Sequence, residues 1–341
     1  MAAMIDWVTA RLPLASMGPI NGGSVVSLGP DGEVEWRTDR RLVVEGSHSA
    51  NITIRGGFGV VDFSGNPAKF EQGHNVFGPP DLNPLMTRVM LHVCRQLDIV
   101  PTAENVRAWQ LGHYTLSRVD LNRMIDCGST KRVLGILRVL NYAATTKYQR
   151  PVADGTTIYL GQKSRRQMLK FYAKGPELLK HPLSVTLAPS WHQLLTDHAA
   201  PMLRLELTNG SKWFHESPYR DAWMWDASTP DKLIDERLAV LEVSDTMRLA
   251  DEAVHGLPPN LMLVYDSWRA GRDLRSHYSK AHFYRLRRQL LDLANIDIAR
   301  VNPRLVVADN EYLGGEPVGP ILRAPGAPVP AWAVGTDLLA S

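Results

Sequence analysis

Residues 116–125 read LSRVDLNRMI, and their alternation of polar and apolar side chains decides the fold. Successive side chains of a β-strand point to opposite faces of a sheet. Arg118, Asp120 and Asn122 therefore share one face, and apolar residues occupy the other. The stretch predicts a half-buried strand whose second face carries charge.

Three further stretches repeat this pattern: VVDFSG (60–65), MLKFYAKG (168–175) and MLRLELT (202–208). Each has an apolar face and a polar face, and the polar faces carry Asp62, Lys170, Tyr172, Lys174, Arg204 and Glu206. A merely solvated face would be a mixture rich in Ser, Thr, Lys and Glu. Isolated carboxylates, arginines and a tyrosine between two lysines favour a functional face over a solvated one, although the residues alone leave both interpretations open.

The remaining chain predicts an α+β fold, with an antiparallel sheet that has helices on one face and a smaller, mostly helical C-terminal domain. Helical spacing follows Asn83, Ser129 is a helix N-cap, and further helices are expected at 191–198, from 228 to 254 and at 280–294. We place a catalytic domain at 1–225 and a helical accessory domain at 226–341. The last thirty residues, rich in Pro and Gly, are expected to run over the surface.

The overall composition says little about the function, whereas the distribution of charge along the sequence is informative. The 341 residues are 44% hydrophobic, carry a net charge of +3 and include two cysteines, Cys94 and Cys127. These values are typical of a reduced globular protein, and no apolar run is long enough to span a membrane. Basic blocks at 160–174 and 266–304 suggest a polyanionic partner, although solvated helix faces would look similar.

The polar faces predict a metal-assisted phosphoryl-transfer chemistry. Carboxylates on adjacent strands can hold Mg²⁺ or Mn²⁺, and the candidates are Asp120, Glu206 and Asp62. A tyrosine beside a metal-bound phosphate can act as a nucleophile, and positive charge from Lys170 and Lys174 would favour its phenolate. The sequence has no phosphate-binding glycine loop, GxSxG elbow or HExxH motif, which argues against an NTPase, an α/β-hydrolase or a zinc protease.

Four segments occur together in an order that resembles one known family. They are SGNPAKFEQGHNVFGPPDL (64–82), LSRVDLN (116–122), TIYLGQKSRRQMLKFYAKGPEL (157–178) and LRLEL (203–207). They resemble the gene II (II/X) replication initiators of filamentous bacteriophages and related plasmids. The resemblance covers most of the chain, from Met4 to about residue 330.

This resemblance implies a rolling-circle replication initiator with a nuclease-like fold. Such an enzyme nicks the plus strand of supercoiled double-stranded phage DNA at its origin, stays attached to the 5′ phosphate through a tyrosine and later rejoins the ends. The Tyr-x-Lys motif of the family falls on Tyr172 and Lys174, and its two Arg-x-acid strands match Arg118/Asp120 and Arg204/Glu206. A host helicase, a single-strand-binding protein and a location in the host bacterial cytoplasm are expected, with no membrane contact.

DNA contacts are expected from four groups of residues. The basic turn of Lys163, Arg165 and Arg166 precedes the proposed nucleophile, and Arg118 and Arg204 would neutralise phosphate charge. His74 and Asn75 in the GHN string, together with the helical region from Arg269 to Arg304, would contact the origin.

Several alternatives remain open on the sequence alone. Tyr159 is a second candidate nucleophile, and His74 could hold its loop together or substitute for the metal-binding histidines of related nucleases. Trp213, Trp223 and Trp225 suit core packing better than base stacking. The rival function is a non-catalytic DNA-binding replication regulator of the same fold, although a pure binder has no need of carboxylates that repel phosphate.

Overall fold

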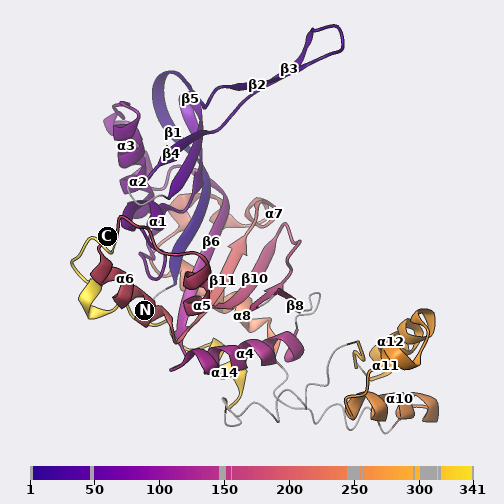
Figure 1. The fold of residues 1–341 in the computed structure, drawn as a ribbon. Helices are drawn as coiled ribbons and strands as arrows, with labels where there is room; N and C mark the ends of the chain where they lie inside the picture. Colours follow the sequence, from indigo (N-terminus) through magenta and orange to yellow (C-terminus); the bar gives the residue numbers. More distant parts are fainter. Residues whose placement is uncertain are drawn as a thin grey trace.

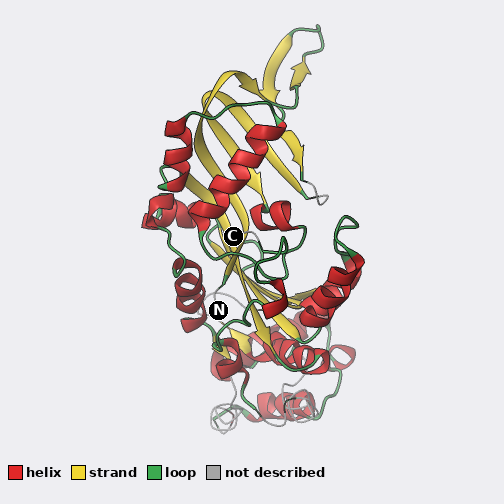
Figure 2. Ribbon diagram, turned by 90° about the vertical axis from the view of Figure 1, so that its left-hand side faces the viewer, coloured by secondary structure: helices red, strands yellow, loops and turns green. Residues whose placement is uncertain are grey.

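A computed structural model shows the arrangement of the chain (Figure 1). It describes residues 3–46, 50–145, 151–154, 156–243, 254, 256–294, 296–299, 313 and 316–339. The predicted α+β class with an antiparallel sheet is confirmed, and Figure 2 shows helices packed beside the strands.

One eight-stranded sheet forms the centre of the protein, and its neighbouring strands are antiparallel. In spatial order its strands are β4 (Leu42–Glu45), β5 (Asn51–Gly65), β1 (Met4–Ile20), β6 (Thr115–Asp126), β11 (Met202–Asn209), β10 (Gln167–Ala173), β9 (Thr157–Leu160) and β8 (Pro151–Asp154). The four stretches with alternating side chains therefore lie in β5, β6, β10 and β11.

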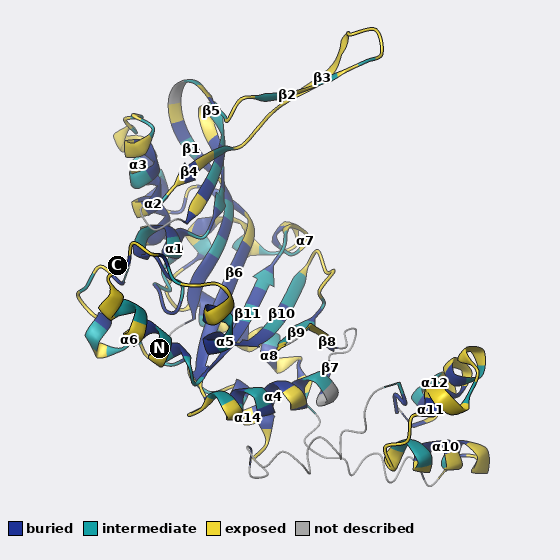
Figure 3. Ribbon diagram, viewed as in Figure 1, coloured by how far each residue is buried: buried dark blue, intermediate teal, exposed yellow. Residues whose placement is uncertain are grey.

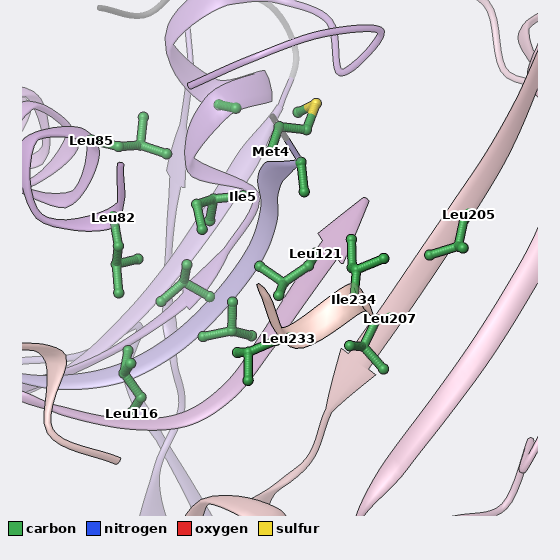
Figure 4. Packing of buried hydrophobic residues seen from close by; sticks show 14 of the residues in the cluster. Met4, Ile5, Leu82, Leu85, Leu116, Leu121, Leu205, Leu207, Leu233 and Ile234 are labelled. Carbon is green, nitrogen blue, oxygen red and sulfur yellow. The ribbon is translucent and has the colours of Figure 1, made fainter. Parts of the chain in front are cut away.

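The apolar face of this sheet is covered by three main helices, α2 (Leu82–Gln96), α4 (Thr130–Ala143) and α8 (Thr229–Ala239). Figure 4 shows Leu233 and Ile234 of α8 in the same core as the sheet leucines. The Ser129 side chain accepts a hydrogen bond from the backbone N–H of Arg132, which confirms the predicted N-cap of α4.

A second, smaller apolar cluster covers one end of the opposite, polar face. It joins Met124 of β6 and Met202 of β11 to α5 (Lys174–Lys180), α6 (Pro189–Ala199) and the loop at residues 76–77. Ala333 and Leu338 of the C-terminal segment complete this cluster. The prediction that the tail merely runs over the surface is therefore wrong for this segment, because its apolar side chains are buried against the sheet.

The helical C-terminal unit is smaller than the predicted domain 226–341. α10 (Pro259–Arg269), α11 (Leu274–His277) and α12 (Lys280–Ala294) enclose a hydrophobic cluster of their own. By contrast, α8 and α14 (Val318–Leu322) share the core of the sheet, so the predicted boundary at 225/226 does not separate the two cores. The helix predicted to reach residue 254 ends at Ala239, and residues 244–253 lie outside the described residues.

Several short elements complete the described fold, some of them absent from the sequence prediction. Two are helices that the sequence analysis does not identify, α1 (Pro67–Gln72) and α3 (Ala103–Gln110). β2 (Ser24–Leu28) and β3 (Val34–Asp39) form a hairpin that projects from the sheet with mostly exposed side chains (Figure 3). The others are β7 (Ala144–Thr145) paired with β12 (Glu242–Val243), α7 (Ser211–His215) and three 3₁₀ turns at Pro218–Arg220, Ala222–Met224 and Ala331–Ala333. Among the described helices, none is long and apolar enough to cross a membrane.

Candidate active site

The strand register brings the predicted polar residues of β10, β11 and β6 into adjacent rows. Lys170 lies opposite Glu206, and Tyr172 lies opposite Arg204. On the other side of β11, Glu206 lies opposite Asn122, and in the next row Thr208 lies opposite Asp120. Directly opposite residues on neighbouring strands share a face, so these side chains form one polar patch.

Tyr172 is held in this patch between two cations. The Lys170 Nζ lies 4.4 Å from the centre of its ring, and the Arg204 guanidinium carbon lies 6.0 Å from it. Tyr172 is only 5% exposed. Burial raises the pKa of its phenol well above 10, an effect that Arg204 opposes and that Glu206 and Asp6 reinforce. The hydroxyl is therefore protonated at neutral pH.

Arg204 is fully buried and joins three distant parts of the sequence. Its guanidinium forms an ion pair with the Asp6 carboxylate at 3.1 Å and donates a hydrogen bond to the backbone carbonyl of Asn75. Asp6 sits where the register of β1 shifts between Ile5 and Trp7, and this bulge turns its carboxylate toward Arg204.

Two asparagine side chains complete the partners of Asp6. Asn66 and Asn75 each donate an amide hydrogen bond to its Oδ1 atom, at 2.6 and 3.1 Å. Burial opposes ionisation of Asp6, but Arg204, these hydrogen bonds and Lys174 outweigh it and lower its pKa. The predicted DNA contacts Arg204 and Asn75 are thus parts of one internal network.

Lys174 does not continue the strand as the alternation predicted. β10 ends at Ala173, and Lys174 is the first residue of α5, where its side chain is buried. Its Nζ donates to Glu177 at 2.6 Å and to Asn75 at 3.1 Å. Burial, with the nearby charge of Arg204, lowers the pKa of Lys174 to about 8.

Asp120 and Glu206 are the two predicted metal-binding carboxylates that the structure brings to this patch. Asp120 is buried and accepts two hydrogen bonds from Arg118, at 2.9 and 2.6 Å. Burial raises the pKa of Asp120 to about 6, with Arg118 opposing and the negative charges of Glu206 and Asp6 adding to the rise. Glu206 pairs with Lys170 at 3.4 Å.

Asn122 is a site residue that the sequence placed on the polar face without giving it a role. Its side chain is completely buried, and within the described chain neither its amide nitrogen nor its amide oxygen has a hydrogen-bond partner. Buried amides normally have partners, so this one indicates a place for a polar ligand. Only the structure could reveal it, because the sequence does not show which amides lack partners.

Asp62 lies apart from these carboxylates. Its side chain pairs with Arg11 at 2.9 Å and with Arg55 at 3.7 Å, next to a pocket near the middle of β1. Among the described residues, no three His, Cys, Asp or Glu side chains come together as a ready-made metal site.

The remaining predicted residues divide into buried and exposed groups. His74 is fully buried, with Nε2 bonded to the Leu338 carbonyl at 2.8 Å and Nδ1 to the Val76 N–H at 3.2 Å, so its ring has no surface from which to contact DNA. The basic turn between β9 and β10 is exposed at Lys163, Arg165 and Arg166.

The alternative nucleophile and the tryptophans are also placed by the structure. Tyr159 is half-buried and lies opposite Lys170, on the other side from Glu206. Trp213 stacks on Tyr219 with ring centres 5.9 Å apart and Trp225 is buried, whereas Trp223 is exposed. The end of the predicted basic region, 300–304, lies outside the described residues.

Comparison with known proteins identifies the family of the chain. Residues 4–227 match the family model for the N-terminal part of a replication-associated protein, the gene II protein. The chain belongs to this family. It is also 32% identical over 339 residues to the replication-associated gene II protein of Enterobacteria phage I2-2, covering 96% of each protein. Family membership confirms the resemblance drawn from the sequence and, with it, the function of a rolling-circle replication initiator.

A solved structure described as a rolling-circle replication initiator from Geobacillus stearothermophilus also aligns with the chain. The two share 11% sequence identity and a TM-score of 0.27, and the alignment covers 63% of this chain and 76% of the other. The assignment to the family rests on the sequence matches.

Replacing Arg204 with methionine tests the internal network. Arg204→Met leaves the buried Asp6 carboxylate without its cation, and the loss of one partner from a buried ion pair costs about 3–5 kcal/mol of unfolding free energy. Urea unfolding measures this cost. Arg11→Met, which removes a guanidinium that is 63% exposed and whose partner Asp62 also pairs with Arg55, is the control and should cost clearly less. Equal losses in the two variants would contradict a central role for Arg204.

The pKa of Asp120 predicts a pH-dependent stability. Because its pKa rises from 3.8 to about 6 on folding, the native state keeps a proton that the unfolded chain loses in this range. The stabilising contribution is present below pH 4 and is lost as the pH rises through 6. Asp120→Asn stays neutral and should gain stability relative to the unmodified protein between pH 4 and 6, with no further change above pH 7. Urea unfolding across this range provides the measurement. If the unmodified protein instead gained stability relative to Asp120→Asn as the pH rises from 4 to 6, the raised pKa of Asp120 would be refuted.

Proposed function

We propose that this protein nicks and rejoins the plus strand of supercoiled phage DNA at its origin, with Tyr172 as the nucleophile. The phenol of Tyr172 gives up its proton as its oxygen attacks the scissile phosphorus, the bond from phosphorus to the 3′ oxygen breaks, and that oxygen takes up a proton and leaves as a 3′-hydroxyl. The 5′ phosphate stays bound to Tyr172. In the reverse reaction a 3′-hydroxyl attacks the phosphotyrosine and restores both the DNA strand and the phenol.

The observation that carries this proposal is the position of Tyr172 between Lys170 and Arg204, beside a pair of carboxylates. Two cations at the ring favour the phenolate that attacks and neutralise the charge that develops on phosphate. In the absence of DNA, burial keeps the phenol protonated and unreactive. A simple DNA-binding protein has no need of buried carboxylates on such a face, since they repel phosphate.

The residues on β6 and β11 fit a divalent cation with oxygen ligands. Asp120, Glu206 and the unpaired amide oxygen of Asn122 lie on one face, with Asn122 directly opposite Glu206. Mg²⁺ and Mn²⁺ prefer such oxygen donors. Burial is the main cause of the raised pKa of Asp120, and the negative charges of Glu206 and Asp6 add to it; a bound cation would offset both effects. When bound there, the metal would supply a Lewis acid that polarises the scissile phosphate.

Origin DNA would reach this site along the exposed basic turn. Lys163, Arg165 and Arg166 lie between β9 and β10, the strand that carries Tyr172, and are placed to contact phosphates. No helicase motif is present in the sequence, so a host helicase would unwind the nicked duplex and a host single-strand-binding protein would cover the displaced strand. Such a reaction belongs in the host bacterial cytoplasm, where the replicating phage DNA lies.

Tyr172→Phe tests the nucleophile on a supercoiled plasmid that carries the cognate origin, in the presence of Mg²⁺. The unmodified protein should nick or relax the plasmid and remain on the 5′ end, whereas Tyr172→Phe should bind the DNA without cutting it, because it has no oxygen to attack phosphorus. Gel electrophoresis of the plasmid and of labelled 5′ ends measures both effects.

Tyr159→Phe is the matched control, since Tyr159 lies on the same face beside Lys170. It should retain cutting and the 5′ adduct. Cutting by Tyr172→Phe together with loss of cutting in Tyr159→Phe would transfer the role to Tyr159. If even the unmodified protein bound the origin without cutting, the protein would be a non-catalytic replication regulator.

Metal binding can be tested without DNA or activity. Mn²⁺ at about ten times its dissociation constant adds roughly 1.4 kcal/mol to stability, which raises the melting temperature by about 3 °C. Asp120→Asn and Glu206→Gln should abolish this shift. Asp62→Asn should retain it, because Asp62 is paired with Arg11 and Arg55 elsewhere. A shift that survives in the first two variants but disappears in Asp62→Asn would move the metal site to Asp62.

A further inference from the structure

A polar pocket lies on the sheet apart from the polar patch around Tyr172. Its volume is about 290 Å³, several times the roughly 30 Å³ that one water molecule occupies. β1, β5 and β6 form one wall, α7 and the turn at 218–220 form another, and Arg41, which precedes β4, closes the end. The active-site proposal uses no residue of this pocket.

Cations dominate the lining of this pocket. Arg11, Arg41 and Arg220 face a single carboxylate, Asp62, so the charge of these four groups is +2. His215 and several hydroxyl groups add hydrogen-bonding capacity, those of Thr9, Thr115, Ser117 and Ser211. A concave site with excess positive charge and many donors fits an anion with several oxygen acceptors.

Two of the arginines have no competing partner. In the part of the chain that the structure describes, the side chains of Arg41 and Arg220 form no hydrogen bond or ion pair with protein. The backbone at Arg41 is nevertheless fixed, because the neighbouring Arg40 exchanges hydrogen bonds with Gly22 and Gly23 at the base of the hairpin. Arg11 is 63% exposed and uses its Nε to bond Asp62, which orients the rest of its guanidinium.

The separation between the pocket and the row of Tyr172 indicates which kind of anion would suit the pocket. Arg11 lies opposite Thr115 of β6, whereas the row of Tyr172 and Arg204 reaches β6 at Met124. These rows are nine residues apart along β6, which corresponds to about 30 Å at roughly 3.3 Å per residue. In duplex DNA that distance spans about nine base pairs, close to one helical turn.

We propose that this pocket binds a backbone phosphate of the origin duplex about one helical turn from the nick. The inference rests on the proposed function, because it takes the scissile phosphate to lie at Tyr172. A phosphodiester supplies the anionic oxygens that Arg41 and Arg220 match in bidentate fashion, and a second anchor at this distance fixes the direction of the duplex across the sheet. Asp62 thereby serves to hold Arg11 rather than to bind metal.

The test compares origin duplexes that extend by different lengths on either side of the nick. A short duplex extends about four base pairs on each side of the nick, and two longer duplexes extend one side or the other to about fifteen. Fluorescence anisotropy without divalent cation measures binding in the Tyr172→Phe background, so cleavage does not enter. One longer duplex should bind more tightly than the short one, and Arg41→Ala and Arg220→Ala should each weaken that binding about tenfold.

The salt dependence identifies a phosphate contact. Each of the two variants should lower the slope of log affinity against log salt by about one for the longer duplex. Arg107→Ala, which removes an exposed arginine of α3, is the matched control and should change neither quantity. Thermal unfolding verifies that all three variants are folded.

Three results would overturn the proposal. They are unchanged affinity and slope in both pocket variants, an equal loss on the short duplex, or an equal loss in Arg107→Ala. Failure of the proposed function gives a different pattern, because Tyr172→Phe would then cut the plasmid while the pocket variants still lost affinity for the longer duplex.

Discussion

The arrangement of the polar face depends on the buried ion pair between Arg204 and Asp6. A charge is not tolerated inside a protein unless it is paired and hydrogen-bonded. Arg204 meets this condition only when three segments far apart in sequence come together, namely the bulge in β1, the loop at Asn75 and the centre of β11. The pair therefore matters less for stability than for geometry, because it forms only when these three segments are correctly placed. It holds the Arg204 side chain beside the Tyr172 ring.

The same network connects Arg204 and Lys174 through the side chain and backbone of Asn75. Asn75 binds Asp6 through its amide nitrogen, Lys174 through its amide oxygen and Arg204 through its backbone carbonyl. The loop that carries Asn75 is held in turn by His74, whose ring bonds the carbonyl of Leu338 in the C-terminal segment. The end of the chain thus supports the site through the loop, although it contributes none of the residues that we propose to act on DNA.

The sequence predicted the strands and their faces because a period of two is a local property. Each of the four alternating stretches forms a strand, and Tyr172, Arg204 and Glu206 share a face as expected. The prediction was wrong at Lys174, where a helix begins and the period changes. It could not find Asp6 either, because a bulge reverses the alternation of β1 and a bulge depends on the partner strands rather than on the residues themselves.

Non-local packing also decides what the charges on this chain can do. The segment from residue 160 to 174 carries five basic residues and no acid, and as a sequence it reads as one DNA-binding patch. In the fold it divides in two. Lys163, Arg165 and Arg166 are exposed in the turn, whereas Lys170 lies against the Tyr172 ring and Lys174 is buried with Glu177. Net charge in a stretch of sequence therefore overstates the charge that DNA can reach, because the fold places Lys170 against a tyrosine ring and buries Lys174.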